Sequence, residues 1–361
     1  MLKILYCNWC LNSRSGTEVV TLETVRALQA RGHQVAVLVW HAGKPADELR
    51  QEGIPVFTSL DELPWNPDVI HSNHLPQALQ CTLKFPIIPQ VFFCHDSCAA
   101  HSSPPKLPNV LHYGAVDEVC AERARTVGGN LTILHNAVDL VRFQQRESLP
   151  QWPARAVMLG KKIARIAAVR EACEQFGISL DTLGTSVEEE VNDLADRLGE
   201  YDLVFAVARN AIESMATGCA VIVVDDRGLA GLVRSEYVNE WRRHNFGKRI
   251  LTREPTREAL VKEILSFNSD DARAVSNRIR DVADLDDYAR DLVNLYESVV
   301  SQSCDKPIDA RCVLDAFPSA FCTAIPSLLQ LMSLQEIRQF SKSLPVEYQL
   351  LWNTLSDPNC T

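Results

Sequence analysis

Short apolar runs alternate with amphipathic stretches along the first 140 residues. The runs predict buried strands, and the stretches between them repeat apolar positions with the spacing of one helix face. The predicted strands are 3–7, 33–39, 55–58, 68–71, 90–94, 110–116 and 131–134, and the predicted helices are 16–31, 47–52, 75–83 and 118–126. Strands separated by helices indicate right-handed β-α-β units and a parallel, Rossmann-type sheet.

A polar stretch at residues 143–153 interrupts this alternation, and we interpret it as an interdomain linker. The alternation of strands and helices then restarts. After Val224 the sequence offers one further possible strand, at 248–252. The predicted strands are 156–159, 179–183, 202–207 and 219–224, and the predicted helices are 163–176, 188–198, 209–217, 257–265, 270–282 and 287–301. We therefore expect an α/β chain with one domain at residues 1–145 and a second at residues 154–300.

Residues 301–361 differ from both halves, because prolines separate apolar helical stretches in this part of the chain. The prolines include Pro307, Pro318, Pro326 and Pro345, and the stretches are 310–317, 326–332, 334–340 and 346–355. This pattern predicts an α-helical extension with apolar faces of its own. Those faces can pack on the second domain or against another copy of the chain, and the sequence does not choose between them.

Composition narrows the class of protein. A chain of 361 residues with 46% hydrophobic positions is long enough for two domains with cores. A net charge of −10 argues against nucleic acid as a partner, but it allows a local basic patch that meets a membrane surface. No apolar run approaches the roughly 20 residues of a membrane-spanning helix, and the N-terminus starts a strand instead of a signal peptide. We expect a cytoplasmic protein that can work at the inner face of the membrane.

The 12 cysteines are scattered, and several fall in apolar segments, which favours reduced thiols. The Cys7–Cys10 spacing is that of a metal or redox pair, but no second tightly spaced pair accompanies it. We therefore predict no metal site.

The segment at residues 202–224 is the most informative one. It predicts a buried strand, a helix that Gly218 ends, and a second buried strand. Arg209 and Glu213 fall on what we expect to be the opening turn of that helix. In an open α/β sheet, the mouth of such a helix faces the crevice where ligands bind.

The stretch at 212–222 resembles the donor-site element of the glycogen-synthase-like, retaining glycosyltransferases of the family 4 type. Their pattern is Glu-x7-Glu-Ala-x-Ala-x-Gly-x-Pro-Val-Ile; its first Glu falls at Phe205 here, and Arg209 stands in a shorter Arg-x-x-x-Glu arrangement. The end of the first helix at 28–35 and the segment at 134–143 also resemble this family. The resemblance covers residues 1 to about 300 and implies the GT-B architecture, two facing Rossmann-like domains.

Candidate site residues in the first domain lie at the carboxyl ends of strands. Gly16 and Thr17 open a helix, where free backbone N–H groups and the helix dipole suit a phosphate. Polar side chains follow two predicted strands, and the resemblance implies that they lie beside the transferred sugar; they are Asn73, His74, His95 and Asp96. We predict that these four residues form the catalytic side of the cleft.

The resemblance implies a donor site in the second domain. Lys161 and Arg165 would neutralise a diphosphate, and Glu213 would accept hydrogen bonds from ribose hydroxyls, with Arg209 beside it. Gly228 lies in a loop that would flank the donor sugar.

The implied function is a metal-independent, retaining hexosyl transfer from a nucleotide-diphosphate sugar to a hydroxyl of a glycan or lipid-linked acceptor, in bacterial surface polysaccharide or glycoconjugate synthesis. The nucleotide sugar is a substrate, and no cofactor is expected. Two alternatives stay open: a non-catalytic GT-B protein that binds sugar nucleotides, and a GT-B sugar-nucleotide epimerase or hydrolase.

Overall fold

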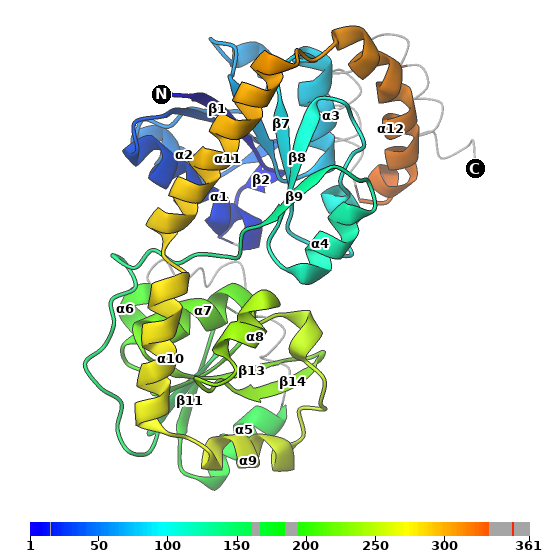
Figure 1. Ribbon diagram of the computed structural model, residues 1–361. Coiled ribbons are helices and arrows are strands. Elements are labelled where there is room, and N and C mark those ends of the chain that lie inside the picture. Colours follow the sequence, from blue (N-terminus) through cyan, green and yellow to red (C-terminus); the bar gives the residue numbers. More distant parts are fainter. Residues whose placement is uncertain (15, 161–166, 185–193, 332–348, 350–361) are drawn as a thin grey trace. The chain divides into compact units, whose positions relative to one another are not determined.

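The computed structural model describes residues 1–14, 16–160, 167–184, 194–331 and 349, with the backbone alone for 323–331. The chain divides into two α/β units (Figure 1). Unit 1 consists of residues 1–134 and 289–361, and unit 2 consists of residues 135–288. This division differs from the predicted one at both ends of the second domain.

Unit 1 contains a parallel sheet of seven strands. In spatial order they are β5 (Val56–Phe57), β3 (Gln34–Leu38), β1 (Lys3–Cys7), β6 (Val69–Ser72), β7 (Gln90–Cys94), β8 (Val110–Ala115) and β9 (Asn130–Ile133). The sequence order reverses between β1 and β6. At such a switch point the loops after the two strands diverge to opposite faces and leave a crevice at their carboxyl ends.

The helices of unit 1 are α1 (Gly16–Ala30), α2 (Lys44–Gln51), α3 (Leu75–Lys84), α4 (Glu118–Arg125), α11 (Leu285–Asp305) and α12 (Ala310–Leu331). Two-residue strands β2 (Cys10–Leu11) and β4 (His41–Ala42) pair beside the sheet, and single 3-10 turns lie at η1 (Leu60–Glu62) and η2 (Ala100–Ser102). Most of α11 belongs to unit 1 because its apolar face is buried there. The predicted second domain, which ran to residue 300, therefore ends earlier, at Tyr288.

The crossover from β7 to β8 contains the 3-10 turn η2 and no α-helix. Helix α12, from the far end of the sequence, contacts α3 and η2 instead. Its Phe317 and Phe321 are fully buried in a cluster with Phe92, Leu79 and Val110. The described part of the extension, α12, thus packs on unit 1, and it supplies the apolar cover that the short crossover lacks.

Helix α12 also runs through Pro318 and Pro326, where the sequence pattern predicted separate helices. A proline inside a helix removes one backbone hydrogen bond and costs about 3 kcal/mol. Burial of Phe317 and Phe321 on either side of Pro318 offsets that cost. Tertiary packing therefore overrides the local signal.

Unit 2 contains a five-stranded sheet. Its spatial order is β11 (Ser179–Leu183), β10 (Arg155–Leu159), β12 (Leu203–Ala206), β13 (Ala220–Asp225) and β14 (Gly228–Leu232). Its helices are α5 (Ala167–Gln175), α6 (Leu194–Leu198), α7 (Ala208–Thr217), α8 (Val238–Arg243), α9 (Arg257–Leu265) and α10 (Ser269–Val282), with a 3-10 turn at η4 (Lys248–Ile250). The order reverses between β10 and β12, so the crevice of this unit lies at their carboxyl ends.

Strand β14 was not predicted, and residues 248–252, the possible strand, begin with the 3-10 turn η4. β14 pairs antiparallel with β13 at the edge of the sheet. Gly228 begins it with φ 158°, and a Cβ there would lie 2.8 Å from the carbonyl oxygen of Leu251. The strand is hidden in the sequence because it forms by this close backbone approach and not by an apolar run.

The predicted linker at 143–153 is packed against unit 2. Phe143 is buried in the core of this unit, and the Arg146 guanidinium donates to the carbonyl oxygen of Tyr201 at 2.7 Å. The division between the units falls instead at Leu134 and His135.

Candidate functional site

A buried polar cluster lies at the switch point of unit 1, around Asn73. Asn73 directly follows β6, and its Oδ1 lies 2.9 Å from His71 Nε2 and 3.1 Å from His95 Nε2. Its Nδ2 lies 3.4 Å from both Tyr6 Oη and Asn8 Oδ1. The carboxyl ends of β1, β6 and β7 thus bring side chains from three separate segments to one amide.

The hydrogen-bond partners assign the tautomers of two rings. Asn73 Oδ1 can only accept, so both histidines donate to it through Nε2. His71 Nδ1 then accepts from Tyr296 Oη of α11 at 2.7 Å. In His95, the lone pair is left on Nδ1, which is the atom that can accept a hydrogen bond from a substrate.

Burial keeps these rings neutral. His71 is stacked between Tyr6 and Phe93, with ring centroids 4.1 and 4.7 Å away. Loss of hydration lowers the pKa of His71 to about 3 and that of His95 to about 4. Burial also raises the pKa of Tyr6 to about 12. The cluster is therefore a set of neutral donors and acceptors at pH 7.

His74 is the N-cap residue of α3, and it is buried. Its Nδ1 accepts from the backbone N–H of Trp9 at 3.0 Å, and its ring centroid lies 4.9 Å from that of His101. Burial holds the pKa of His74 well below its usual value. The predicted pair Asn73 and His74 therefore lies at the site, but the two side chains have different neighbours.

Asp96 is exposed and shapes a turn. Its Oδ1 accepts from the backbone N–H groups of Cys98 and Ala99, both at 2.6 Å. Partial burial acts to raise the pKa of Asp96, but these two N–H groups act against it and the net pKa is lowered. Asp96 thus has a structural role in the loop after β7, and its predicted catalytic role stays a prediction.

The loop that leads into α1 is organised by Glu18, which the sequence analysis did not select. Gly16 and Thr17 begin α1 as predicted, and Glu18 is the third residue of this helix. The buried carboxylate accepts from the backbone N–H groups of Asn12 and Ser13, each at 3.3 Å, and also from the Ser13 hydroxyl. A capping-box pattern could have revealed this role of Glu18. In that pattern a Glu follows a polar N-cap residue by three positions and precedes the apolar face of a helix.

Glu18 bears on the predicted phosphate site. It places a negative charge in the first turn of α1 and satisfies two loop N–H groups that a phosphate would otherwise use. Gly16 itself is exposed, and a Cβ there would meet no atom within 4 Å among the described residues. The surroundings of Gly16 are thus open, but they are less favourable to an anion than the sequence suggested.

In unit 2, Arg209 and Glu213 form a buried ion pair. Arg209 Nε lies 2.7 Å from Glu213 Oε1, and the two side chains are 12% and 5% exposed. Helix α7 begins at Ala208, so Glu213 lies in its second turn and not, as predicted, in its first. The helix dipole acts mainly on the first turn, so Arg209 is the partner that favours the charged form of this carboxylate.

Backbone strain gathers at the start of α7. Ala208, Asn245 and Phe246 are the non-glycine residues with positive φ, at 50°, 52° and 50°, in the part of the chain that is described. The Ala208 N–H donates to the Phe246 carbonyl oxygen at 2.8 Å, which joins the turn at 245–247 to the helix. Strained residues often cluster at functional sites, so we include this turn in the candidate site.

The other predicted donor-site residues are Lys161, Arg165 and Gly228. Lys161 and Arg165 lie outside the described residues. Gly160, which precedes them, approaches Asn210 of α7, since its Cβ would lie 3.8 Å from Asn210 Nδ2. Gly228 has the structural role described above, and its contact with a donor stays a prediction.

Cys7 and Cys10, whose spacing is that of a metal or redox pair, each contact another residue. Cys7 Sγ lies 3.6 Å from Cys81 Sγ, and Cys10 Sγ donates to Glu18. Within the described ranges, no group of three or more His, Cys, Asp or Glu side chains is arranged to hold a metal ion. Nor does any described helix have the length and apolar character needed to cross a membrane.

No family model matches the sequence, and no curated protein matches it. Solved structures do match the fold. HepE of Anabaena in complex with UDP aligns with a TM-score of 0.60 at 13% identity, over 82% of this chain and 100% of that one. The fold class is GT-B. The complex of HepE with UDP and glucose gives a TM-score of 0.58 at 14% identity, over 82% and 100%. AviGT4, a glycosyltransferase involved in avilamycin A biosynthesis, gives 0.53 at 14% identity, over 83% and 98%. The predicted fold is thus confirmed.

Proposed function

We propose that the chain is a retaining glycosyltransferase that transfers a sugar from a nucleotide-diphosphate sugar to a hydroxyl acceptor. The observation that carries this proposal is the buried Arg209–Glu213 pair at the switch point of unit 2. It supports a donor site because the fold is shared with HepE, which was solved with UDP, with UDP-glucose, and with UDP and glucose. UDP-sugars are accordingly the first donors to test.

The roles on the donor side follow from side-chain chemistry. Glu213 carries two acceptor oxygens, which suit the paired hydroxyls of a ribose. Arg209 has five N–H donors in a planar fork, so it can hold Glu213 and still reach a phosphate oxygen. Growing charge on the leaving diphosphate would be stabilised by Arg209 and by the N-terminal N–H groups of α7.

No carboxylate is present at the position of the family's first Glu. Phe205 occupies it in β12 and is fully buried in the core. We therefore propose a reaction without a protein nucleophile, in which the leaving phosphate takes the proton of the acceptor hydroxyl. We also propose that no metal is required.

The Asn73 cluster would position the acceptor and the transferred sugar. His95 Nδ1 can accept a hydrogen bond from a hydroxyl group, but a pKa of about 4 makes it a weak base at pH 7. Its role is therefore orientation, and Asn73 fixes the ring for this role. This is compatible with proton transfer to the leaving phosphate.

A product assay tests the proposal. Purified protein is incubated with a mixture of UDP-hexoses and a panel of glycan and lipid-linked acceptors, and the products are identified by mass spectrometry. A glycosylated acceptor with retained anomeric configuration is the expected result. Free sugar would indicate a hydrolase, an isomeric nucleotide sugar an epimerase, and UDP-sugar binding without any product a non-catalytic binding protein.

The matched variants are Glu213→Gln and Glu240→Gln. Glu240 is exposed on α8, so its substitution controls for loss of one charge. Transfer should fall with the first variant and stay unchanged with the second. Cytoplasmic location and a role in surface polysaccharide or glycoconjugate synthesis remain parts of the proposal that this assay does not address.

A further inference from the structure

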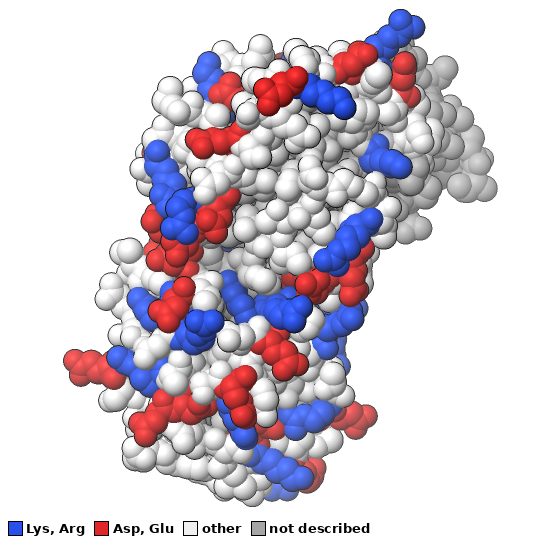
Figure 2. Space-filling model, in the orientation of Figure 1, with Lys and Arg blue, Asp and Glu red and all other residues white. Residues whose placement is uncertain are grey.

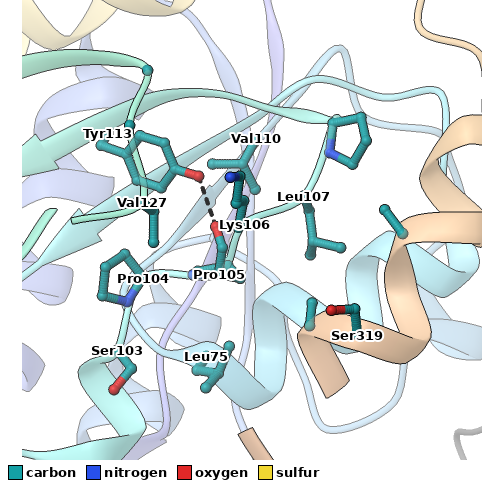
Figure 3. Close-up of a pocket in the computed structure, with 15 residues that line it drawn as sticks. Leu75, Ser103, Pro104, Pro105, Lys106, Leu107, Val110, Tyr113, Val127 and Ser319 are labelled. Atoms are coloured by element: carbon teal, nitrogen blue, oxygen red, sulfur yellow. Dashed lines mark hydrogen bonds between the residues drawn. The ribbon is translucent and has the colours of Figure 1, made fainter. Parts of the chain in front are cut away.

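Unit 1 contains a cavity of about 930 Å³ that the sequence analysis did not anticipate. Its walls are the loop at 103–108, strand β8, the turn at 127–129 and helix α12 (Figure 3). A protein interior is close-packed, with few voids larger than a water molecule. A cavity of this volume lies in the range of small-molecule sites, which is about 300–1,000 Å³.

The loop wall is held in place by specific contacts. Tyr113 Oη donates to the carbonyl oxygen of Pro105 at 2.7 Å, as the dashed line in Figure 3 shows. Arg123 Nη2 donates to the hydroxyl of Ser103, at the start of this loop. Pro104, Pro105 and Pro108 further stiffen the loop, because each fixes its own φ angle. These contacts and prolines hold the loop wall of the cavity in place.

Helix α12 keeps the cavity open through the size of its side chains. Phe317 and Phe321 anchor the helix in the core of unit 1. The positions that line the cavity are Ala316, Ser319 and Ala320, whose side chains are among the smallest. The helix is thus fixed by large residues on one side and leaves space with small residues on the other.

The lining selects an apolar ligand. Among the described residues that line the cavity, Lys106 alone carries a charge, and it is exposed. Burial raises the pKa of Tyr113 to about 12, so this ring is neutral. The middle of the face of unit 1 seen in Figure 2, over β8 and β9, also shows no charged side chain. Burial in such surroundings favours a hydrocarbon group, because each CH₂ that leaves water lowers the free energy.

Two residues that line the cavity are close in the sequence to His74 and His101. Leu75 lines it and directly follows His74, and Ser103 lines it two residues after His101. The rings of His74 and His101 lie 4.9 Å apart. We propose that the cavity binds the hydrocarbon part of an amphiphilic acceptor whose polar end lies at His74 and His101. The role of this ligand as the acceptor rests on the proposed function, whereas the binding of its hydrocarbon part in the cavity does not.

The test compares two soluble ligands that differ in the hydrocarbon chain, decyl β-glucoside and methyl β-glucoside. Binding is measured by isothermal titration, below the concentration at which the decyl compound forms micelles. We expect the decyl compound to bind at least tenfold more tightly to the unmodified protein. Ala320→Phe and Ser319→Phe fill the cavity and should abolish that difference, whereas Leu314→Phe on the exposed side of the same helix should keep it. Ser319 is exposed, so its variant is expected to fold even if Ala320→Phe does not.

Two further measurements are needed. The first asks whether the hydrocarbon group can come from a membrane, and the second distinguishes failure of the cavity proposal from failure of the proposed function. Sedimentation with phosphatidylglycerol vesicles tests whether the hydrocarbon group can come from a membrane. If Ser319→Phe reduces vesicle binding, the result supports the cavity. If Ser319→Phe leaves vesicle binding unchanged, the protein adsorbs through its surface and the cavity proposal is overturned. UDP binding is measured on every variant. Absence of UDP binding with the tenfold decyl preference intact would refute the proposed function alone. Equal binding of the two glucosides, or a preference that survives Ser319→Phe, would refute the cavity proposal alone.

Discussion

Mild acid is expected to destabilise unit 1 more than unit 2, because unit 1 contains buried neutral imidazole rings. Loss of hydration lowers the pKa of His71 to about 3 and that of His95 to about 4. In the unfolded chain both rings bind a proton as the pH falls through about 6.5. The unfolded state then holds more protons than the folded state, so stability decreases from pH 6.5 downward until the folded pKa is reached.

The size of the effect follows from these pKa values. Between pH 6.5 and 5.0 the two folded rings stay neutral, whereas the unfolded rings go from half to almost fully protonated, so each ring costs about 1.6 kcal/mol. Together they remove about 3 kcal/mol from a free energy of unfolding that is typically about 5–15 kcal/mol. Most carboxyl groups titrate below this window, so the histidines dominate the change.

Hydrogen-exchange pulse labelling in urea, after equilibration at pH 6.5 and at pH 5.0, reports each unit separately. Peptides from β6 report unit 1, and peptides from β12 report unit 2 as an internal control. His71→Phe combined with Tyr296→Phe removes one titrating ring without leaving the Tyr296 hydroxyl unpaired, and it should reduce the pH dependence of unit 1 by about 1.6 kcal/mol. Tyr296→Phe alone should keep the full dependence. Equal unfolding midpoints of unit 1 at both pH values, or an unchanged dependence in the double variant, would refute the reasoning.

Four more outcomes are expected. Glu213→Gln should weaken UDP binding by roughly 1.5–3 kcal/mol and also lower the melting temperature, since it leaves Arg209 buried without its charge partner; normal UDP affinity would remove Glu213 from the donor site, and Glu240→Gln should change neither quantity. Gly16→Val should fold normally, because a Cβ there meets open space, and lose donor affinity; an unchanged affinity would show that the loop before α1 does not contact the phosphates. Transfer should survive EDTA, and loss of activity that Mg²⁺ or Mn²⁺ restores would contradict metal independence. Phe317→Ala should destabilise unit 1 by about 3–5 kcal/mol in urea unfolding, and a loss confined to unit 2 would contradict the packing of α12.

Part of this fold could be read from the sequence because parallel strands buried on both faces appear as continuous apolar runs. The strands at 3–7 and 90–94 have the predicted bounds. Helix α7 ends where predicted, because Gly218 adopts φ 97° at its C-cap, a conformation that glycine enters at little cost. These features depend on neighbours along the chain, and local signals encode them directly.

The sequence also indicated which strand ends carry polar side chains, but not how those side chains meet. Tyr296 and His71 are separated by 225 positions, and their hydrogen bond exists only because α11 returns to unit 1. Nothing near Tyr296 in the sequence marks it as a partner of a strand end.

The tertiary structure likewise decided the course of α12, the edge strand β14 and the cavity beside the loop at 103–108. These features depend on contacts between distant segments. Buried phenylalanines keep α12 intact through Pro318. The backbone at Leu251 lies against Gly228, the first residue of β14. The sequence by itself determined the elements, their order and the α/β class, since each depends on short-range periodicity. Only the fold could determine the Asn73 cluster and the cavity, because both consist of residues that topology brings together from separate parts of the chain.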